Sequence, residues 1–206
     1  MNKLILVGIF MLSTSMFSQS VFFTTGKNYT DYDFTTSEKN QNEEFSSGSG
    51  NFYEVGYTRS INRKNTFRYS ISINLNEYNS NGGDLATSYA WETDYIGLKN
   101  NIEFDLINIS DKFKISLNGG FTVQTLINGQ QRINGLSYDL MESEDFKGVF
   151  TNVGFGGSLF YGVSSTMGVA AGYDFSKSFS MTKTDSGQIL NLTNNQIYFK
   201  LIISKK

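Results

Sequence analysis

Alternation of apolar and polar residues is the clearest pattern in this chain. Between Phe67 and Asn76, every odd-numbered residue is apolar or aromatic and every even-numbered residue is polar. Successive side chains of a β-strand point to opposite faces of the sheet, so this segment predicts a strand with one apolar and one polar face. Similar runs recur along the chain. We expect eight strands, at residues 21–29, 52–61, 67–77, 91–106, 113–126, 149–161, 167–175 and 196–203.

The connections between these strands alternate between long and short. The short ones are residues 62–66, 107–112 and 162–166, and the long ones are residues 30–51, 78–90, 127–147 and 176–195. If consecutive strands are antiparallel, all short turns lie at one end of the sheet and all long loops at the other. Bacterial outer-membrane barrels have this asymmetry. The sequence therefore predicts an all-β fold, an eight-stranded antiparallel up-and-down transmembrane β-barrel.

Aromatic residues collect near both ends of the expected strands. The set on the loop side is Tyr53, Tyr57, Tyr89, Trp91, Tyr95 and Tyr173, and the set on the turn side is Phe67, Tyr69, Phe104, Phe113 and Tyr161. Two such aromatic girdles are expected at the lipid–water interfaces of a membrane barrel. In the fourth strand, Trp91 and Tyr95 have the opposite phase from Ile96 and Leu98, which predicts a β-bulge near residues 95–97.

Alternation alone does not establish which face of the strands lies inside. A soluble barrel or sandwich with its apolar face inward is the alternative to a barrel embedded in lipid. The loop asymmetry and the two aromatic bands favour an apolar exterior. The small polar residues opposite the rings favour it too, because a narrow eight-stranded barrel has little interior room. We therefore expect a polar interior.

The first 20 residues predict a secretory signal peptide. Asn2 and Lys3 precede an apolar run from Leu4 to Leu12, and a mostly small and polar segment follows at residues 13–20. The apolar run is too short to span a membrane as a helix. We expect residues 1–20 to be removed on export, residues 21–206 to form the barrel domain, and the outer membrane to be the destination.

Composition narrows the possible chemistry. The 206-residue chain has no Cys and no His, which excludes disulfides, thiolate metal sites and catalytic groups based on imidazole. Its net charge of −2 gives no reason to expect a nucleic-acid partner. The acidic stretches at residues 31–33 and 142–145 offer oxygen ligands for Ca²⁺, but neither matches the EF-hand spacing. We expect no catalytic residues, no cofactor and no metal site.

Five charged residues lie on the face that is predicted to line the interior. They are Glu54, Arg68, Lys99, Glu103 and Lys200. Inside a narrow barrel these charges must pair, because an unpaired buried charge is very costly. Arg68 and Glu103 belong to strand ends on the same side, so we expect them to lie close together. We interpret the five as a structural cluster that fills the interior, with a gate or ion path as the functional alternative.

The signal peptide, the eight alternating strands and the order of turns and loops resemble a known group of proteins. These are the small outer-membrane β-barrel proteins of the OmpA-transmembrane-domain and OmpX-like superfamily, in the form common in Bacteroidetes. The segments Ser15–Gln19 and Gln196–Ile203 are also similar to theirs. Members often end on an aromatic residue, whereas this chain continues past Phe199 to Lys206. We expect a monomer that contacts outer-membrane lipid.

Three functions remain open at this point. The first is a non-enzymatic outer-membrane barrel with an envelope-structural role, whose extracellular loops bind a ligand, a surface or a protein. The second is a narrow channel or transport barrel for small solutes, although a lumen filled with side chains argues against an open pore. The third is a membrane-embedded lipid-modifying enzyme, for which the usual general base, His, is missing. We predict the first.

Overall fold

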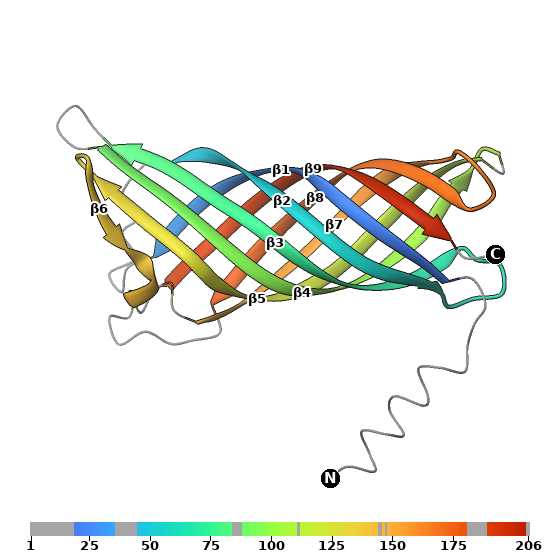
Figure 1. The fold of residues 1–206 in the computed structure, drawn as a ribbon, viewed down its shortest axis with the longest axis horizontal. Coiled ribbons are helices and arrows are strands. Elements are labelled where there is room, and N and C mark those ends of the chain that lie inside the picture. Colours follow the sequence, from blue (N-terminus) through green and yellow to red (C-terminus); the bar gives the residue numbers. More distant parts are fainter. Residues whose placement is uncertain are drawn as a thin grey trace, which may run out of the picture.

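Eight long antiparallel strands close into a barrel (Figure 1). The computed structural model describes residues 19–35, 45–83, 88–110, 112–143, 146, 148–180 and 189–204. The barrel strands are β1 (Gln19–Thr35), β2 (Phe45–Ser60), β3 (Phe67–Gly83), β4 (Ser88–Asn108), β5 (Phe113–Ile133), β7 (Val149–Gly162), β8 (Met167–Ser180) and β9 (Ile189–Ser204). Each pairs with its neighbour along the chain, apart from a short β6 between β5 and β7. The predicted fold class, an eight-stranded up-and-down transmembrane barrel, is confirmed.

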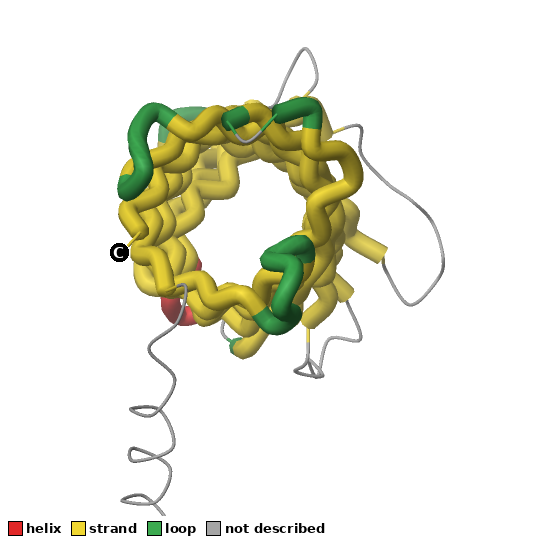
Figure 2. Tube along the Cα trace, turned by 90° about the vertical axis from the view of Figure 1, so that its right-hand side faces the viewer, coloured by secondary structure: helices red, strands yellow, loops and turns green. Residues whose placement is uncertain are grey.

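The seam that closes the barrel joins the first strand to the last. β1 pairs with β9 from Ser20 opposite Ser204 to Thr35 opposite Ile189. At the turn end of the seam the two serine hydroxyls are 2.7 Å apart. Viewed along its axis, the wall forms a complete ring (Figure 2).

Short turns lie at one end of the barrel, where β1 begins and β9 ends (Figure 1). The turn between β2 and β3 shows why a few residues are sufficient. Asn62 accepts hydrogen bonds through Oδ1 from the backbone N–H groups of Thr66 and Phe67, at 2.9 and 3.0 Å. Asn65 adopts a positive φ of 54°, which asparagine tolerates better than most residues. Among the described residues, no helix is long and apolar enough to cross a membrane.

At the opposite end the strands extend into all four segments that were predicted as long loops, and one of these segments also contains an additional hairpin. We expected a loop over residues 127–147, but β5 continues to Ile133 and returns as β6 (Leu136–Asp139), followed by the 3₁₀ turn η1 (Leu140–Glu142). Asn134 and Gly135 link the two strands with positive φ values of 50° and 83°. An Asn-Gly pair with both φ angles positive is the preferred two-residue hairpin turn, so the local sequence specifies this return.

The outer face of the wall is apolar and the inner face is polar over most of the barrel. Ile73 and Phe199 are 54% and 69% exposed on the outside, while the neighbouring Ser72 and Asn74 are buried inside. This arrangement is the reverse of a soluble barrel, so the alternative with an apolar face inward is wrong for this part of the molecule.

Trp91 and Tyr95 contradict the predicted outer girdle. Both side chains point into the barrel, with exposed fractions of 5% and 0%. The alternation of β4 also continues without a slip, because its odd residues face inward from Trp91 to Asp105. A register shift does lie between Asp94 and Tyr95, but the extra residue, Ile127, belongs to β5.

The predicted signal peptide falls almost entirely on residues 1–18, which lie outside the described residues. β1 begins at Gln19, two residues before the expected start of the barrel domain.

Candidate functional site

The turn-side half of the barrel interior contains a network of ion pairs. Arg68 contacts Glu103 at 2.5 Å and also pairs with Asp105. Lys114 lies 3.3 Å from Asp105, and Lys200 lies 3.8 Å from Glu103. These residues come from β3, β4, β5 and β9, so the network ties together strands that are not all neighbours. We call this group the lower network.

A second group of charges lies deeper in the lumen, and we call it the upper network. Lys99 is 3.3 Å from Asp174 and 3.8 Å from Glu54. Ser72 donates a hydrogen bond to Glu54 at 2.5 Å, and Asn118 donates one to Asp174 at 3.0 Å. Each carboxylate therefore has a cation and a neutral donor nearby, which offsets the cost of removing it from water.

All five sequence-predicted lumen residues lie in these two networks. Arg68, Glu103 and Lys200 are in the lower network, and Glu54 and Lys99 are in the upper one. Sequence reasoning missed three partners, Asp105, Lys114 and Asp174. Their positions carry a usable signal, because each has the same phase as an inward-facing residue two positions away on its strand.

Glycines in the wall make room for the inward side chains of the upper network. A Cβ at Gly156 would lie 2.1 Å from the Asp174 carboxylate, and one at Gly172 would lie 2.3 Å from the Tyr198 ring. Both glycines face the lumen, so their missing side chains leave space that the charge and the ring occupy.

Amide side chains form a layer between the upper network and the loop-side end. Gln196 donates to Asn28 Oδ1 at 2.7 Å, and a small cavity of about 40 Å³ lies within the layer. The side-chain oxygens of Asn74, Asn101 and Asn152 have no hydrogen-bond partner there. A cavity of this size holds a few water molecules, which would supply the missing donors.

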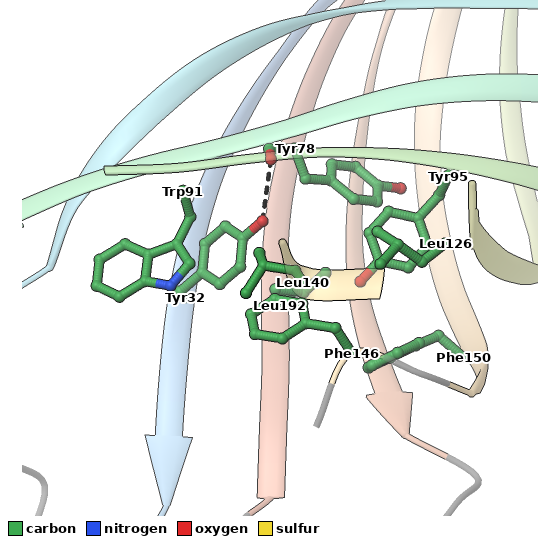
Figure 3. Packing of buried hydrophobic residues seen from close by; sticks show 9 residues of the cluster. All are labelled: Tyr32, Tyr78, Trp91, Tyr95, Leu126, Leu140, Phe146, Phe150 and Leu192. Atoms are coloured by element: carbon green, nitrogen blue, oxygen red, sulfur yellow. Dashed lines mark hydrogen bonds between the residues drawn. The ribbon is translucent and has the colours of Figure 1, made fainter. Parts of the chain in front are cut away.

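At the loop-side end the interior becomes apolar and aromatic. The buried cluster consists of Tyr32, Tyr78, Trp91, Tyr95, Leu126, Leu140, Phe146, Phe150 and Leu192 (Figure 3). We call it the aromatic plug. Its polar atoms are mostly used: Tyr32 donates through its hydroxyl to the Tyr78 carbonyl oxygen at 2.9 Å and lies 2.7 Å from Thr93 Oγ1. The Tyr95 and Phe150 rings meet edge to face, with centroids 5.6 Å apart.

The outer face changes character at the same level as the inner face. On β3 the outward residues change from Leu75 to Glu77, and the inward residues change from Asn76 to Tyr78. The paired strand β4 does the same: Leu75 lies opposite Ile96, and Glu77 lies opposite Asp94. On β3 and β4 the wall above this level is polar outside and mainly aromatic inside, as in a protein surrounded by water, whereas Ile127 of β5 and Phe179 of β8 remain exposed at this end. We call this loop-side part of the barrel the head.

The described residues contain no group of three or more His, Cys, Asp or Glu side chains that could hold a metal ion. The acidic stretches at residues 31–33 and 142–145 lie partly outside the residues whose side chains are described.

The apolar wall and the lumen filled with paired charges, amides and rings place the fold in the class of small transmembrane β-barrels. No protein-family model and no curated protein matches the sequence. Among solved structures, the outer membrane protein OprG from Pseudomonas aeruginosa is similar, with a TM-score of 0.53 and 8% identity over 89% of this chain and 95% of that one. Neisserial surface protein A has a TM-score of 0.50 and 10% identity over 89% of this chain and 96% of its own. At these identities the likeness concerns the fold alone.

Proposed function

We propose that this chain is a non-enzymatic barrel of the outer membrane. In this proposal the wall has a structural role in the envelope, and the head presents a binding surface outside the cell. The observation that carries the proposal is the exchange of polarity between the two faces of β3 and β4 at one level, where the aromatic plug begins inside. A single closed strand set with an apolar exterior below and a polar exterior above fits a barrel that leaves the lipid partway along its length.

The length of the apolar exterior supports this placement. Its outward residues span 67–75 on β3 and 96–106 on β4, which is nine and eleven residues. Tilted strands need about 9–11 residues to cross the hydrocarbon core. β3 then continues to Gly83, eight residues beyond Leu75. At about 3.3 Å per residue along a tilted strand, the head projects roughly 20 Å above the lipid.

The contents of the lumen favour a closed wall over a conduit or a catalyst. The aromatic plug fills the interior of the head, and the two networks of paired charges cross the interior below it. The lumen charges contact one another and are held by hydrogen bonds, so they serve the packing of the barrel. A solute path would have to break these pairs, which is costly in a narrow interior.

The hairpin of β5 and β6 supplies an apolar surface on the head. Leu136, Tyr138 and Met141 are 64%, 49% and 38% exposed there. Exposed apolar residues grouped outside the lipid-facing band are typical of interaction sites. We propose that this hairpin is part of the surface through which the head binds a ligand, another surface or a partner protein.

The orientation is tested by cysteine labelling, because the chain has no Cys of its own. We expect a membrane-impermeant maleimide to label Leu136→Cys on intact cells. Lys64→Cys, in a short turn, should be labelled only after the outer membrane is permeabilised. Ile73→Cys, in the apolar band, should resist the reagent in both cases. Labelling of Lys64→Cys on intact cells would contradict the orientation, and equal labelling of all three would contradict membrane insertion.

Planar-bilayer recording on the refolded protein separates the structural role from the channel alternative. We expect no stable conductance steps from the wild-type barrel. Reproducible conductance steps from protein that runs as the folded form on a gel would overturn the closed-wall part of the proposal.

The binding role is tested on cells that lack the protein and are complemented with variants. We expect the triple variant Leu136→Ser, Tyr138→Ser and Met141→Ser to reach the membrane but to reduce adhesion of cells to protein-coated surfaces. The control is a matched triple variant on the polar part of the same hairpin, Gln130→Ser, Arg132→Ser and Ser137→Ala. Equal adhesion by wild type and the apolar triple variant would remove the hairpin from the binding surface.

A further inference from the structure

The turn-side end of the lumen contains a cavity that the structural role of the barrel does not use. Its volume is about 250 Å³, several times that of the cavity in the amide layer. Basic side chains line it from several strands, among them Arg59, Arg68, Lys114 and Lys200, and Glu103 is the acidic residue in the lining. Phe22, Phe160 and Ile202 supply an apolar part of the wall.

The charges around this cavity are not balanced. In the lower network three cations, Arg68, Lys114 and Lys200, share two carboxylates, Glu103 and Asp105. The upper network has the opposite imbalance, because Lys99 alone faces Glu54 and Asp174. The lumen as a whole is therefore neutral over these eight groups, but its positive excess lies on the side of the cavity. An excess buried cation stabilises an anion placed beside it.

Among the three cations of the lower network, Lys200 is the one without a hydrogen bond to a described residue. Its ammonium group lies 3.8 Å from Glu103, beyond hydrogen-bond distance, and 4.8 Å from the centre of the Phe22 ring. Its side chain is 14% exposed, and no hydrogen bond from its Nζ to a described residue is present. An ammonium group has three donors, so this one has donors left for water or for a ligand in the cavity.

The surroundings of the cavity also attract anions. The three turns carry the basic residues Arg63, Lys64 and Lys112 against one acidic residue, Asp111. Clustered charges of one sign raise the local concentration of counter-ions and steer them toward a cleft. The closed wall separates the cavity from the bilayer, so a ligand would come from the aqueous side rather than from the lipid.

We propose that this cavity binds a small soluble anion, a phosphate or carboxylate that also carries an apolar group. The anionic group would accept hydrogen bonds from Lys200 and Lys114, and the apolar group would cover Phe22 and Phe160. The site lies at the opposite end of the barrel from the head. Its test is therefore independent of the test of the hairpin's binding role.

Calorimetric titration of the barrel in phosphatidylcholine nanodiscs tests the proposal, with phenyl phosphate as the probe and empty nanodiscs as the blank. We expect one site per barrel. Lys200→Met and Lys114→Gln should each weaken binding about tenfold, the size expected when one charge-assisted hydrogen bond is lost. Lys112→Gln and Lys64→Gln, which remove exposed turn charges outside the cavity lining, should leave the affinity within about twofold. Heat-modifiability on a gel verifies that each variant is folded.

Several results would overturn the proposal. No heat of binding to the wild type at millimolar phenyl phosphate would exclude the site. Equal weakening in the Lys112→Gln control would show that the anion is attracted by the overall positive charge and not bound in the cavity. Inorganic phosphate should bind about tenfold more weakly than phenyl phosphate, because it leaves the two rings uncovered. Equal affinity for both would overturn the apolar part. Competition by phosphatidylglycerol in the nanodisc would show that the anion is a lipid headgroup and not a soluble molecule.

Discussion

The two halves of this barrel fill their interiors in opposite ways. Below the level of Leu75 and Ile96, the lumen holds ion pairs such as Arg68 with Glu103, and the outer face is apolar. Above that level, the lumen holds rings such as Tyr95 and Phe150, which meet edge to face, and the outer faces of β3 and β4 are polar. The strands continue through both halves without interruption.

This difference is the one expected if lipid surrounds the lower half and water surrounds the upper half, as we propose. In lipid, the backbone is satisfied by the closed sheet, and small polar side chains inside leave the large apolar ones to face the hydrocarbon. In water, exposure of apolar residues on the exterior is unfavourable, so the rings would be buried in the interior as in a soluble protein. In this proposal the apolar and polar residues of one strand exchange faces where the strand leaves the lipid.

The largest expected effect comes from the aromatic plug. Phe150→Ala removes a fully buried ring, and we expect a loss of about 3–5 kcal/mol of unfolding free energy. Phe155→Ala on the same strand is the control, because that ring is 66% exposed on the outer face and leaves no internal cavity. Urea titration followed by the fluorescence of Trp91, the single tryptophan, measures both. Equal losses would contradict a packed core in the head.

A charge placed on the outer face should locate the boundary between the halves. Ile73→Arg puts a cation in the apolar band, and we expect a cost of about 2–4 kcal/mol. Asn79→Arg lies on the outer face of the same strand within the head, where the cost should be within about 0.5 kcal/mol. Refolding yield and urea midpoints in bilayers provide the comparison. A similar penalty at both positions would mean that the head also lies in lipid.

Removal of Arg68 tests the lower network. Arg68→Ala leaves Asp105 with Lys114 and Glu103 with the distant Lys200, and we expect a loss of about 2–3 kcal/mol. This is less than for a fully buried pair, because the Arg68 side chain retains 21% exposure. The temperature at which the folded band disappears on a gel should fall, with no new conductance in bilayers. An unchanged temperature would count against a structural role for this network.

The smallest effect is expected for the hydroxyl of Tyr32. Tyr32→Phe keeps the ring in the plug but removes the hydrogen bond to the Tyr78 carbonyl, so we expect a loss of about 1 kcal/mol. Thr93 still donates to that carbonyl at 2.7 Å, which limits the damage. Chemical denaturation of wild type and variant side by side resolves a difference of this size. A loss equal to that of Phe150→Ala would show that the hydroxyl, and not the ring, organises the plug.

Much of the wall could be predicted from alternation. The run from Phe67 to Asn76 assigns each residue of that part of β3 to the face it occupies, because one medium lies outside the strand over this length. The upper parts of the strands were missed for a physical reason. The rule that apolar residues face outward holds only where lipid surrounds the wall.

The sequence did contain a sign of the change. Trp91 and Tyr95 have the opposite phase from Ile96, and we interpreted this as a bulge. The residues instead lie on a regular strand, and both rings are buried inside the barrel. The candidate site shows the same limit: the phase of Arg68 and Glu103 predicts that they face inward, whereas the cavity beside Lys200 depends on side chains from β1, β7 and β9 that only the closed barrel brings together.

The seam between β1 and β9 has a consequence for how the molecule forms. Ser20 and Ser204 are separated by 184 positions along the chain, so the barrel has no complete ring until its last strand has arrived. Contacts at this separation are slow to form, because the chain loses the entropy of the whole intervening loop first. Until that moment β1 and β9 each present an open edge that can pair with other chains. A polypeptide interrupted before Ile189 would therefore lack its closing strand entirely, and its rate of aggregation should exceed that of any point variant of the full chain.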